Sequence, residues 1–571
     1  MKLVSVKILG EDFRSLANNK LYKFNEGVIR KDRLSSKVFA GLNGSGKSNF
    51  LELLAEIFFY LEKYHLKSVS TSEKRAKNIG FEIEYILPID SLLLGVAKYN
   101  FKDGCHVRII KQLDELPEFS FKKYGGKDFI RLDDTTEFLL PTKVIAYTSG
   151  QNELLSNPFH KIKYHYFKEL QKVDPQNNAV SDRLFFLDNS SNFSIFVANM
   201  LLASPAKMDY VRDIFKIEDL HSFRITINLV DYKKYKFHIS DEIQSYIDRL
   251  KQCATTWINR QKEREDIIIL DYSINQATHD AFKFHFNTSF ELFKAFYELD
   301  SLNLHLVAKD TRSLMLKAHK SLNISDELPK PDPSRLIFRI EKINLNKIVE
   351  EGKPSKEIYY KGLSDGEHQF NEVIGSVMMM EEEGCLFLMD EPDTHFNPIW
   401  RAKMIEMLNF VAATKFEKRE RYKVDPNNKI ILAKNKKPVK EKYLYPSKVR
   451  RHEIIITTHS PFVISDSQSE DVYKFDKVNG EVVYVNPKIE TYGASVSLLL
   501  QEIFDRRISI SDLSNYDLGE LRNMLRELKR PTVLKATIEE IKAKLTGFGE
   551  SIEKFDLYSL LNQIEKDIKK K

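Results

Sequence analysis

The chain has 571 residues, too many for one compact hydrophobic core, so we expect two to four domains. Apolar residues make up 42% of it and charged residues 30%, which is typical of a soluble globular protein. The formal net charge is +6, and no run of eighteen apolar residues occurs, which excludes a membrane-spanning helix.

Three cysteines are scattered singly along the chain, at Cys105, Cys253 and Cys385. Single cysteines exclude a zinc ribbon and a disulfide framework, and they favour a reducing cytoplasm. The N-terminal sequence MKLVSVKILGEDF reaches an acidic residue before the apolar core of a signal peptide could form. We therefore expect a cytoplasmic protein without a membrane partner.

The first motif follows two short strands, predicted at 3–8 and 37–40. The second strand runs into GLNGSGKS, residues 41–48, and then into a segment whose apolar residues recur at helical spacing. A strand, a glycine-rich loop and a helix in this order are the setting in which G-x-x-x-x-G-K-[ST] predicts a phosphate-binding P-loop.

Each part of this loop has a chemical reason. Glycines let the backbone N–H groups turn inward around phosphates, and the helix N-terminus adds partial positive charge. Lys47 supplies a point charge for the β- and γ-phosphates, and Ser48 is a candidate Mg²⁺ ligand. The residues that we assign to nucleotide binding here are Asn43, Gly44, Ser45, Gly46, Lys47, Ser48 and Asn49.

Between the P-loop and the next motif the sequence changes character. Residues 81–150 are rich in predicted strands, the last of which ends just before Gln151. Residues 155–334 are mostly helical, with a few strands such as FRITINL and DIIIL. No heptad pattern is sustained, so we expect no long coiled-coil arm. Strand patterning resumes at RLIFRIEKINL, residues 335–345.

A polar turn that opens a helix follows, in KGLSDGEHQF at residues 361–370. Two buried strands come next, each with chemistry at its C-terminal tip, where parallel sheets place their ligands. CLFLMDEPD ends in Asp390, a candidate Mg²⁺ ligand, and Glu391, a candidate base for the attacking water. EIIITTHSPF ends in His459, which this context predicts to be a γ-phosphate sensor.

A strongly basic segment, residues 415–451, separates the last two motifs. It holds fourteen Lys or Arg residues against four acids, a net charge of +10. This composition favours a nucleic-acid surface or a surface for an acidic partner, and the alternative is a solvated loop. We expect the segment to project from the body of the protein.

After His459 the sequence predicts a hairpin over 471–485, with Asn479-Gly480 at the turn, and then a helical tail to residue 571. The last helix carries an apolar stripe, which either packs on the protein's own body or docks a partner. The stripe consists of Leu557, Leu560, Leu561, Ile564 and Ile568.

The order of these motifs resembles that of the ABC-type ATPases. In that family the signature turn, Leu-Ser-Gly-Gly-Gln or a variant, contacts the γ-phosphate held by a second copy of the chain. The resemblance thus implies a homodimer, or a higher oligomer built from it, around ATP and Mg²⁺, with Ser364 and Gly366 acting in trans. It also assigns Gln151 to the metal and the attacking water. Asp365 departs from the family by replacing the first glycine.

Within that family, DEPDTHFNP and TTHSPFVISD are similar to the RecF/SMC/OLD branch, and so is the N-terminal sequence with Arg14. Arg14 and Asp393 are assigned to nucleotide binding on this ground. In its moderate length, its helical insertion and the absence of a C-terminal nuclease, the chain most resembles the PtuA ATPases of Septu anti-phage systems, and restriction-system-associated ATPases are a near-equal match. The resemblance implies a separate HNH nuclease partner and, in retron-associated systems, a reverse transcriptase with its RNA–DNA product.

These observations predict an α/β fold: an ABC-ATPase head with a mostly helical insertion and a helical C-terminal region. The head comprises residues 1–154 and 335–500, the insertion 155–334, and the C-terminal region 501–571. We expect an ATPase that is not itself a nuclease, because about 110 residues after His459 are too few for a Toprim domain. The alternative functions are a RecF-like DNA-repair ATPase and a low-turnover, ATP-bound assembly platform.

Overall fold

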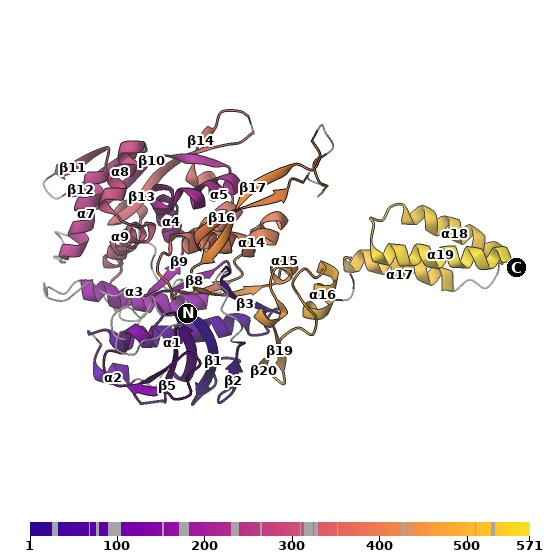
Figure 1. The fold of residues 1–571 in the computed structure, drawn as a ribbon, viewed down its shortest axis with the longest axis horizontal. Helices are drawn as coiled ribbons and strands as arrows, with labels where there is room; N and C mark the ends of the chain where they lie inside the picture. Colours follow the sequence, from indigo (N-terminus) through magenta and orange to yellow (C-terminus); the bar gives the residue numbers. More distant parts are fainter. Residues whose placement is uncertain are drawn as a thin grey trace.

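A computed structural model places most of the chain in three β-sheets with flanking helices, a two-stranded ribbon and a C-terminal helical bundle (Figure 1). Gln151 lies outside the described residues. The structure describes residues 1–25, 32–67, 69–75, 79–88, 104–150, 153–170, 182–229, 239–262, 265–308, 310–312, 324, 329, 331–350, 352–424, 429–433, 437–506, 508, 510–526 and 531–570.

The central sheet has seven strands in the order β20-β19-β3-β18-β15-β8-β9. All neighbours are parallel except the β19–β20 hairpin. Its middle strands are apolar on both faces and fully buried, as expected for a parallel sheet with covered faces. The strands are β3 (Ser35–Ala40), β8 (Val144–Thr148), β9 (Leu184–Leu187), β15 (Leu386–Asp390), β18 (Glu453–Thr458), β19 (Val472–Val478) and β20 (Glu481–Val485).

The hairpin expected over 471–485 is confirmed. Asn479 and Gly480 occupy its turn with φ angles of 53° and 86°. Two successive positive φ angles are what a tight two-residue hairpin turn requires, and asparagine and glycine tolerate them best.

The N-terminal sheet is antiparallel, in the order β2-β1-β4-β5-β6-β7. Helix α1 (Lys47–His65) shares one hydrophobic core with it and with the central sheet, through side chains such as Leu51 and Leu54. The strand-rich character expected for 81–150 is confirmed. The strands are β1 (Lys2–Leu9), β2 (Leu21–Lys23), β4 (Gly80–Leu87), β5 (Cys105–Lys111), β6 (Glu118–Lys123) and β7 (Ile130–Leu132), and α2 (Thr71–Lys74) precedes β4.

The third sheet, in the order β11-β12-β10-β13-β14, is also antiparallel. The expected boundary at 334/335 falls between β10 and β13, which pair directly, so the insertion and the following segment share one sheet. Among the described residues of 155–334, more lie in helices than in strands. The strands are β10 (Ile217–Asn228), β11 (Thr256–Lys262), β12 (Glu265–Ser273), β13 (Phe338–Lys347) and β14 (Lys356–Tyr359).

The helices of this region pack on the third sheet and on the edge of the central sheet, in a second large core that joins both sheets. The first of them, α3 (Asn157–Leu170), packs against α1. The others are α4 (Asn189–Leu202), α5 (Pro205–Phe215), α7 (Asp241–Cys253), α8 (Gln276–His285) and α9 (Ser289–Ser301).

The helix that begins in the KGLSDGEHQF stretch is not a regular α-helix. Residues 365–379 form one helical run in which α12 (Asp365–Phe370) passes through a π-helical turn (Asn371–Gly375) into α13 (Ser376–Met379). A π-helical turn inside an α-helix is common at functional sites.

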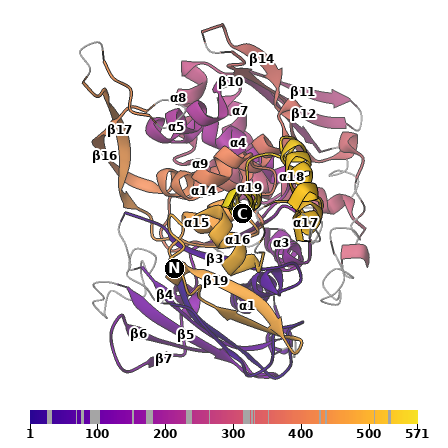
Figure 2. The same cartoon turned by 90° about the vertical axis from the view of Figure 1, so that its right-hand side faces the viewer.

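The basic segment folds into a two-stranded antiparallel ribbon, β16 (Ala413–Tyr422) and β17 (Lys440–Val449), which follows α14 (Pro398–Val411). The ribbon projects from the body, as the sequence predicts (Figures 1 and 2). It is therefore an ordered surface element along its two strands rather than only a solvated loop.

After the central sheet, α15 (Pro461–Ser465) and α16 (Val496–Phe504) lead to a bundle of α17 (Asp512–Arg526), α18 (Pro531–Leu545) and α19 (Ile552–Lys570). Figure 1 shows the bundle standing away from the rest of the molecule. Its core is separate and includes most of the predicted stripe on the last helix; the side chain of Ile568 is not described. The stripe thus packs within the bundle. None of the described helices is long and apolar enough to cross a membrane.

Candidate nucleotide-binding site

The P-loop lies at the carboxyl end of β3 and closes onto α1, as its sequence predicts. Gly41 and Gly46 have φ angles of 141° and 96°. A Cβ atom on Gly41 would lie 2.3 Å from the carbonyl oxygen of Phe475, and one on Gly46 would lie 2.3 Å from Cγ2 of Val482. Both positions therefore need glycine for conformation and for space.

Lys47 is buried at the first turn of α1. Its ammonium donates to the carbonyl oxygens of Gly41 and Leu42, both at 3.0 Å, and lies 3.3 Å from Nε2 of His459. Burial lowers the pKa of Lys47 to about 8, against the opposing effect of Glu391 and Asp390. The lysine thus stays mainly charged at neutral pH, inside the loop that would surround a phosphate chain.

Asp390 ends β15 beside the P-loop. Its Oδ1 accepts hydrogen bonds from Ser48 Oγ at 3.0 Å and from Thr457 Oγ1 at 2.5 Å. Burial raises the pKa of this carboxyl, and the two hydroxyl bonds oppose that rise. Among the described residues no group of three His, Cys, Asp or Glu side chains could hold a metal, so the set here is one carboxylate and one hydroxyl. That set fits Mg²⁺, which keeps several waters and takes its other ligands from phosphates.

Glu391 has an unusual backbone, with a φ angle of 51°. Its amide donates to the carbonyl oxygen and to Oγ1 of Thr457, at 3.2 and 3.0 Å. Its carboxylate lies 3.3 Å from Nε2 of His459, and this contact lowers the pKa of Glu391. A non-glycine residue held in this region of φ is costly and is often found at active sites.

Three side chains that the sequence placed on separate strand ends therefore meet at one point. Lys47 follows β3, Glu391 follows β15, and His459 follows β18, between the other two. The pairing of β18 with both β3 and β15 in parallel brings their carboxyl ends to one edge of the sheet.

Arg14 lies in the turn between Phe13 and Leu16, with a φ angle of 54°. Its guanidinium contacts the carboxylate of Glu52 on α1. The neighbouring Ser15 Oγ accepts a hydrogen bond of 2.7 Å from Asn49 Nδ2 of the P-loop helix. The structure thus places the Arg14 turn against the P-loop helix, and the assignment of Arg14 to nucleotide binding stays a prediction.

Ser364 is exposed and caps α12. Its hydroxyl and its amide both donate to Oε2 of Glu367, at 3.0 and 2.8 Å, in a reciprocal capping box. A Cβ atom on Gly366 would lie 2.7 Å from the carbonyl oxygen of His395, which explains the glycine. Within the described residues, Ser364 forms no hydrogen bond to the P-loop of its own chain.

The remaining predicted site residues differ in burial and in hydrogen bonding. Asp393 is 4% exposed and accepts a hydrogen bond of 2.9 Å from Thr458 Oγ1, so its carboxylate is held inside the protein. Asn43 is exposed on the loop, and the hydroxyl of Ser45 is buried without a partner in the described structure. The assignment of Gln151 to metal and water stays a prediction.

Sequence reasoning missed Thr457, Thr458 and Glu52. The two threonines stand directly before His459, and their hydroxyls fix the carboxylates of Asp390 and Asp393. Two hydroxyl residues at the tip of an apolar strand could have signalled this role. Glu52 gave no such signal, because its partner Arg14 is distant in the sequence.

No protein-family model matches the chain, and no curated protein matches it. Among solved structures, the Smc head domain with a coiled coil and joint derived from Pyrococcus yayanosii is 11% identical to this chain. The alignment covers 85% of this chain and 97% of that one, with a TM-score of 0.28. At this TM-score the likeness supports no assignment.

Proposed function

We propose that this chain is a Mg²⁺-dependent ATPase whose complete site forms between two copies of the chain. The observation that carries the proposal is the convergence of Lys47, His459 and Glu391, with Ser48 and Asp390 beside them, at one edge of the central sheet. A glycine-rich loop that opens a helix and a buried strand that ends in two acids are the parts that phosphoryl transfer needs.

The residues of one copy supply most of the chemistry. The loop amides and Lys47 would hold the phosphates, and Ser48 with Asp390 would hold Mg²⁺. Bound Mg²⁺ would neutralise phosphate charge. Glu391 would orient a water molecule and accept its proton. Nε2 of His459 now contacts Lys47 and Glu391. With ATP bound, it would instead donate a hydrogen bond to the terminal phosphate.

The second copy would contribute the turn at Ser364. This turn is exposed and starts a helix, and its capping hydrogen bonds run between Ser364 and Glu367, whose carboxylate also contacts Lys347 on β13. Its backbone is therefore fixed in advance by the capping box, while its surface stays accessible to another molecule. Asp365 is exposed at the same turn and would bring a negative charge close to the partner's phosphates, which favours slow closure or slow hydrolysis.

Nucleotide titration tests this proposal. Lys47→Ala removes the ammonium group that contacts the loop carbonyls of Gly41 and Leu42, so we expect loss of measurable Mg-ATP binding by calorimetry. Lys353→Ala changes an exposed lysine elsewhere and is the matched control. An unchanged ATP affinity in Lys47→Ala would contradict the proposal.

The finer proposal, which rests on the moderate length and the mostly helical insertion that the chain shares with PtuA-like proteins, is that the ATPase holds and regulates a separate HNH nuclease in anti-phage defence. A retron reverse transcriptase with its RNA–DNA product would join the complex in some systems. Co-expression with the neighbouring reading frames tests this: a co-purifying nuclease and phage protection that Lys47→Ala abolishes are expected. DNA-stimulated turnover without a nuclease partner would instead favour DNA repair.

A further inference from the structure

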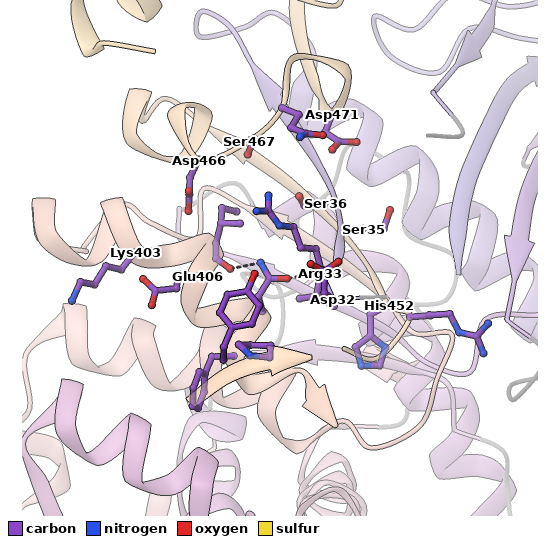
Figure 3. Close-up of a pocket in the computed structure, with 18 of the residues that line it drawn as sticks. Asp32, Arg33, Ser35, Ser36, Lys403, Glu406, His452, Asp466, Ser467 and Asp471 are labelled. Carbon is purple, nitrogen blue, oxygen red and sulfur yellow. Dashed lines mark hydrogen bonds between the residues drawn. The ribbon is translucent and has the colours of Figure 1, made fainter. Parts of the chain in front are cut away.

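A cleft of 830 Å³ lies at the edge of the central sheet opposite the P-loop (Figure 3). Its wall includes Ser35 at the start of β3, His452 just before β18 and Asp471 just before β19. A strand of this length spans about 20 Å, so the cleft is a separate site from the P-loop. We call it the amino-edge cleft.

Four tyrosines from three parts of the chain line the amino-edge cleft. Tyr443 and Tyr445 come from β17 of the basic ribbon, Tyr210 from α5, and Tyr492 from the segment before α16. Tyr210 stacks on Phe410 with ring centroids 3.8 Å apart, so its ring is held in place. Tyr210 is half-buried, and a ring held in this way is a surface on which a flat ring can stack.

The cleft also offers hydrogen-bonding groups of both kinds. The carboxylates of Glu406 and Asp466 lie on one side of Arg33, and His452 lies on the other (Figure 3). His452 is fully buried, and neither of its ring nitrogens has a hydrogen-bond partner within the described structure. Because the His452 side chain is not exposed, it forms part of the wall, and the polar groups open to a bound molecule are those of Arg33, Glu406 and Asp466. A flat group with both donors and acceptors fits this set, whereas the acids disfavour a phosphate inside.

The ribbon that forms one wall is basic. Its two strands hold seven Lys or Arg residues and three Glu. Each glutamate pairs with a cation of the ribbon itself, through Arg419, Arg421 and Lys440. In the described structure no carboxylate lies within ion-pair distance of Lys442 or Lys448, both exposed on β17. Among the strands that the structure describes, none pairs with the far edge of β17, because the ribbon consists of β16 and β17.

The two faces of the ribbon differ. The register pairs Arg419 with Tyr443 and Glu417 with Tyr445, so these side chains share one face. Tyr443 and Tyr445 on that face are half-buried and line the cleft. Tyr422 lies on the opposite face and is 51% exposed. The ribbon therefore joins a charged edge to an aromatic inner face.

We propose that the ribbon and the amino-edge cleft bind single-stranded nucleic acid, with phosphates along the β17 edge and one unstacked base inside the cleft. Lysines bind the backbone without reading sequence, tyrosines stack on the base, and carboxylates accept from its amino groups. This surface is separate from the ATP site, so the binding proposal can be tested independently of the proposed ATPase activity.

A base pair within a duplex cannot occupy the cleft. In a duplex the bases face each other and present only groove edges, so a base must leave its stack to lie between side chains. A cleft of 830 Å³ is of the size that binds one small ligand rather than a double helix. The proposal thus commits to single strands or to unpaired ends.

Fluorescence anisotropy with a labelled single-stranded oligonucleotide and its duplex, each over a salt series, tests the proposal in the full chain. Tyr443→Ala should weaken single-strand binding about 5- to 150-fold and leave the salt slope unchanged. Tyr422→Ala on the other face should change it little. Lys442→Ala with Lys448→Ala should flatten the log–log salt slope by about 1.4 in total, and Lys353→Ala should not.

A second measurement isolates the base. An oligonucleotide series with one abasic position should show a single position at which affinity falls about as much as in Tyr443→Ala. In the Tyr443→Ala protein that abasic position should cause little further loss, because the two changes remove one contact. Independent, additive losses would overturn the base pocket.

Other results would also overturn the proposal. One is that the parent protein binds duplex and single strand with equal affinity, and that Tyr443→Ala and Tyr422→Ala change the single-strand affinity equally. Another is no saturable binding of either oligonucleotide. A third is that the lysine variants leave nucleic-acid binding intact and lose a co-purifying protein, which would make the ribbon a protein interface.

Discussion

Replacement of Glu391 by glutamine separates ATP binding from ATP hydrolysis. Glutamine has the same length and can keep both the contact with His459 and the backbone bonds to Thr457. The φ angle of 51° is no harder for glutamine than for glutamate, so we expect little change in stability. What the variant loses is a group that can take a proton from water.

The size of the effect follows from that loss. A positioned general base contributes about 10²- to 10⁴-fold to the rate, which corresponds to about 3–5 kcal/mol in the activation barrier. The groups placed to hold the phosphates and Mg²⁺, Lys47, Ser48 and Asp390, are unchanged. One negative charge near Lys47 is removed, so ATP affinity should stay within about tenfold of the parent or increase.

Phosphate release, calorimetry and light scattering together measure these quantities. We expect hydrolysis by Glu391→Gln to fall at least 100-fold while the protein binds ATP and accumulates as an ATP-dependent dimer. Glu350→Gln, at an exposed site, is the control and should hydrolyse ATP normally. A Glu391→Gln protein that hydrolyses ATP within a few-fold of the parent would refute the assigned role of Glu391.

Three further predictions follow from buried or strained groups. Lys37→Met removes the cation that lies 2.8 Å from the fully buried carboxylate of Glu453, so urea denaturation should show a loss of about 3–5 kcal/mol in the free energy of unfolding, and a loss below 1 kcal/mol would contradict this. Because the pKa of Lys47 in the free protein is about 8, ATP binding must take up a proton above that pH. Affinity measured by calorimetry should therefore fall by up to tenfold per pH unit above 8, and a flat profile to pH 9.5 would contradict it. Gly46→Ala forces a Cβ atom into Val482 at a φ angle of 96°, so ATP binding should be lost, and normal binding would refute the loop geometry.

The sequence predicted those parts of the site whose signals are local. The P-loop, the tip at Asp390 and the tip at His459 each combine a short apolar strand with polar residues at its end. Strands that are apolar on both faces are buried at the centre of a parallel sheet, and their carboxyl ends then lie at one edge. The contacts of His459 with both Lys47 and Glu391 follow from that topology.

The parts that could not be predicted depend on pairing over long distances in the sequence. Strand β10 pairs with β13, more than 100 residues later in the sequence. The residue pattern of neither strand predicts which strand it pairs with. The amino-edge cleft brings together α5, β17 and the segment before β3, none of which carries a motif. The positive φ angle at Glu391 has no signature either, because glutamate is not a residue that favours that conformation.

Mixing two inactive variants tests most directly whether the complete site forms between two copies. Ser364→Arg places a bulky cation in the exposed turn but leaves the P-loop intact, and Lys47→Ala does the reverse. If Ser364 acts in trans, a mixed dimer contains one complete site, so the mixture should hydrolyse ATP faster than the sum of the two variants measured alone. Activity equal to that sum, with no ATP-dependent mixed dimer by light scattering, would contradict the account.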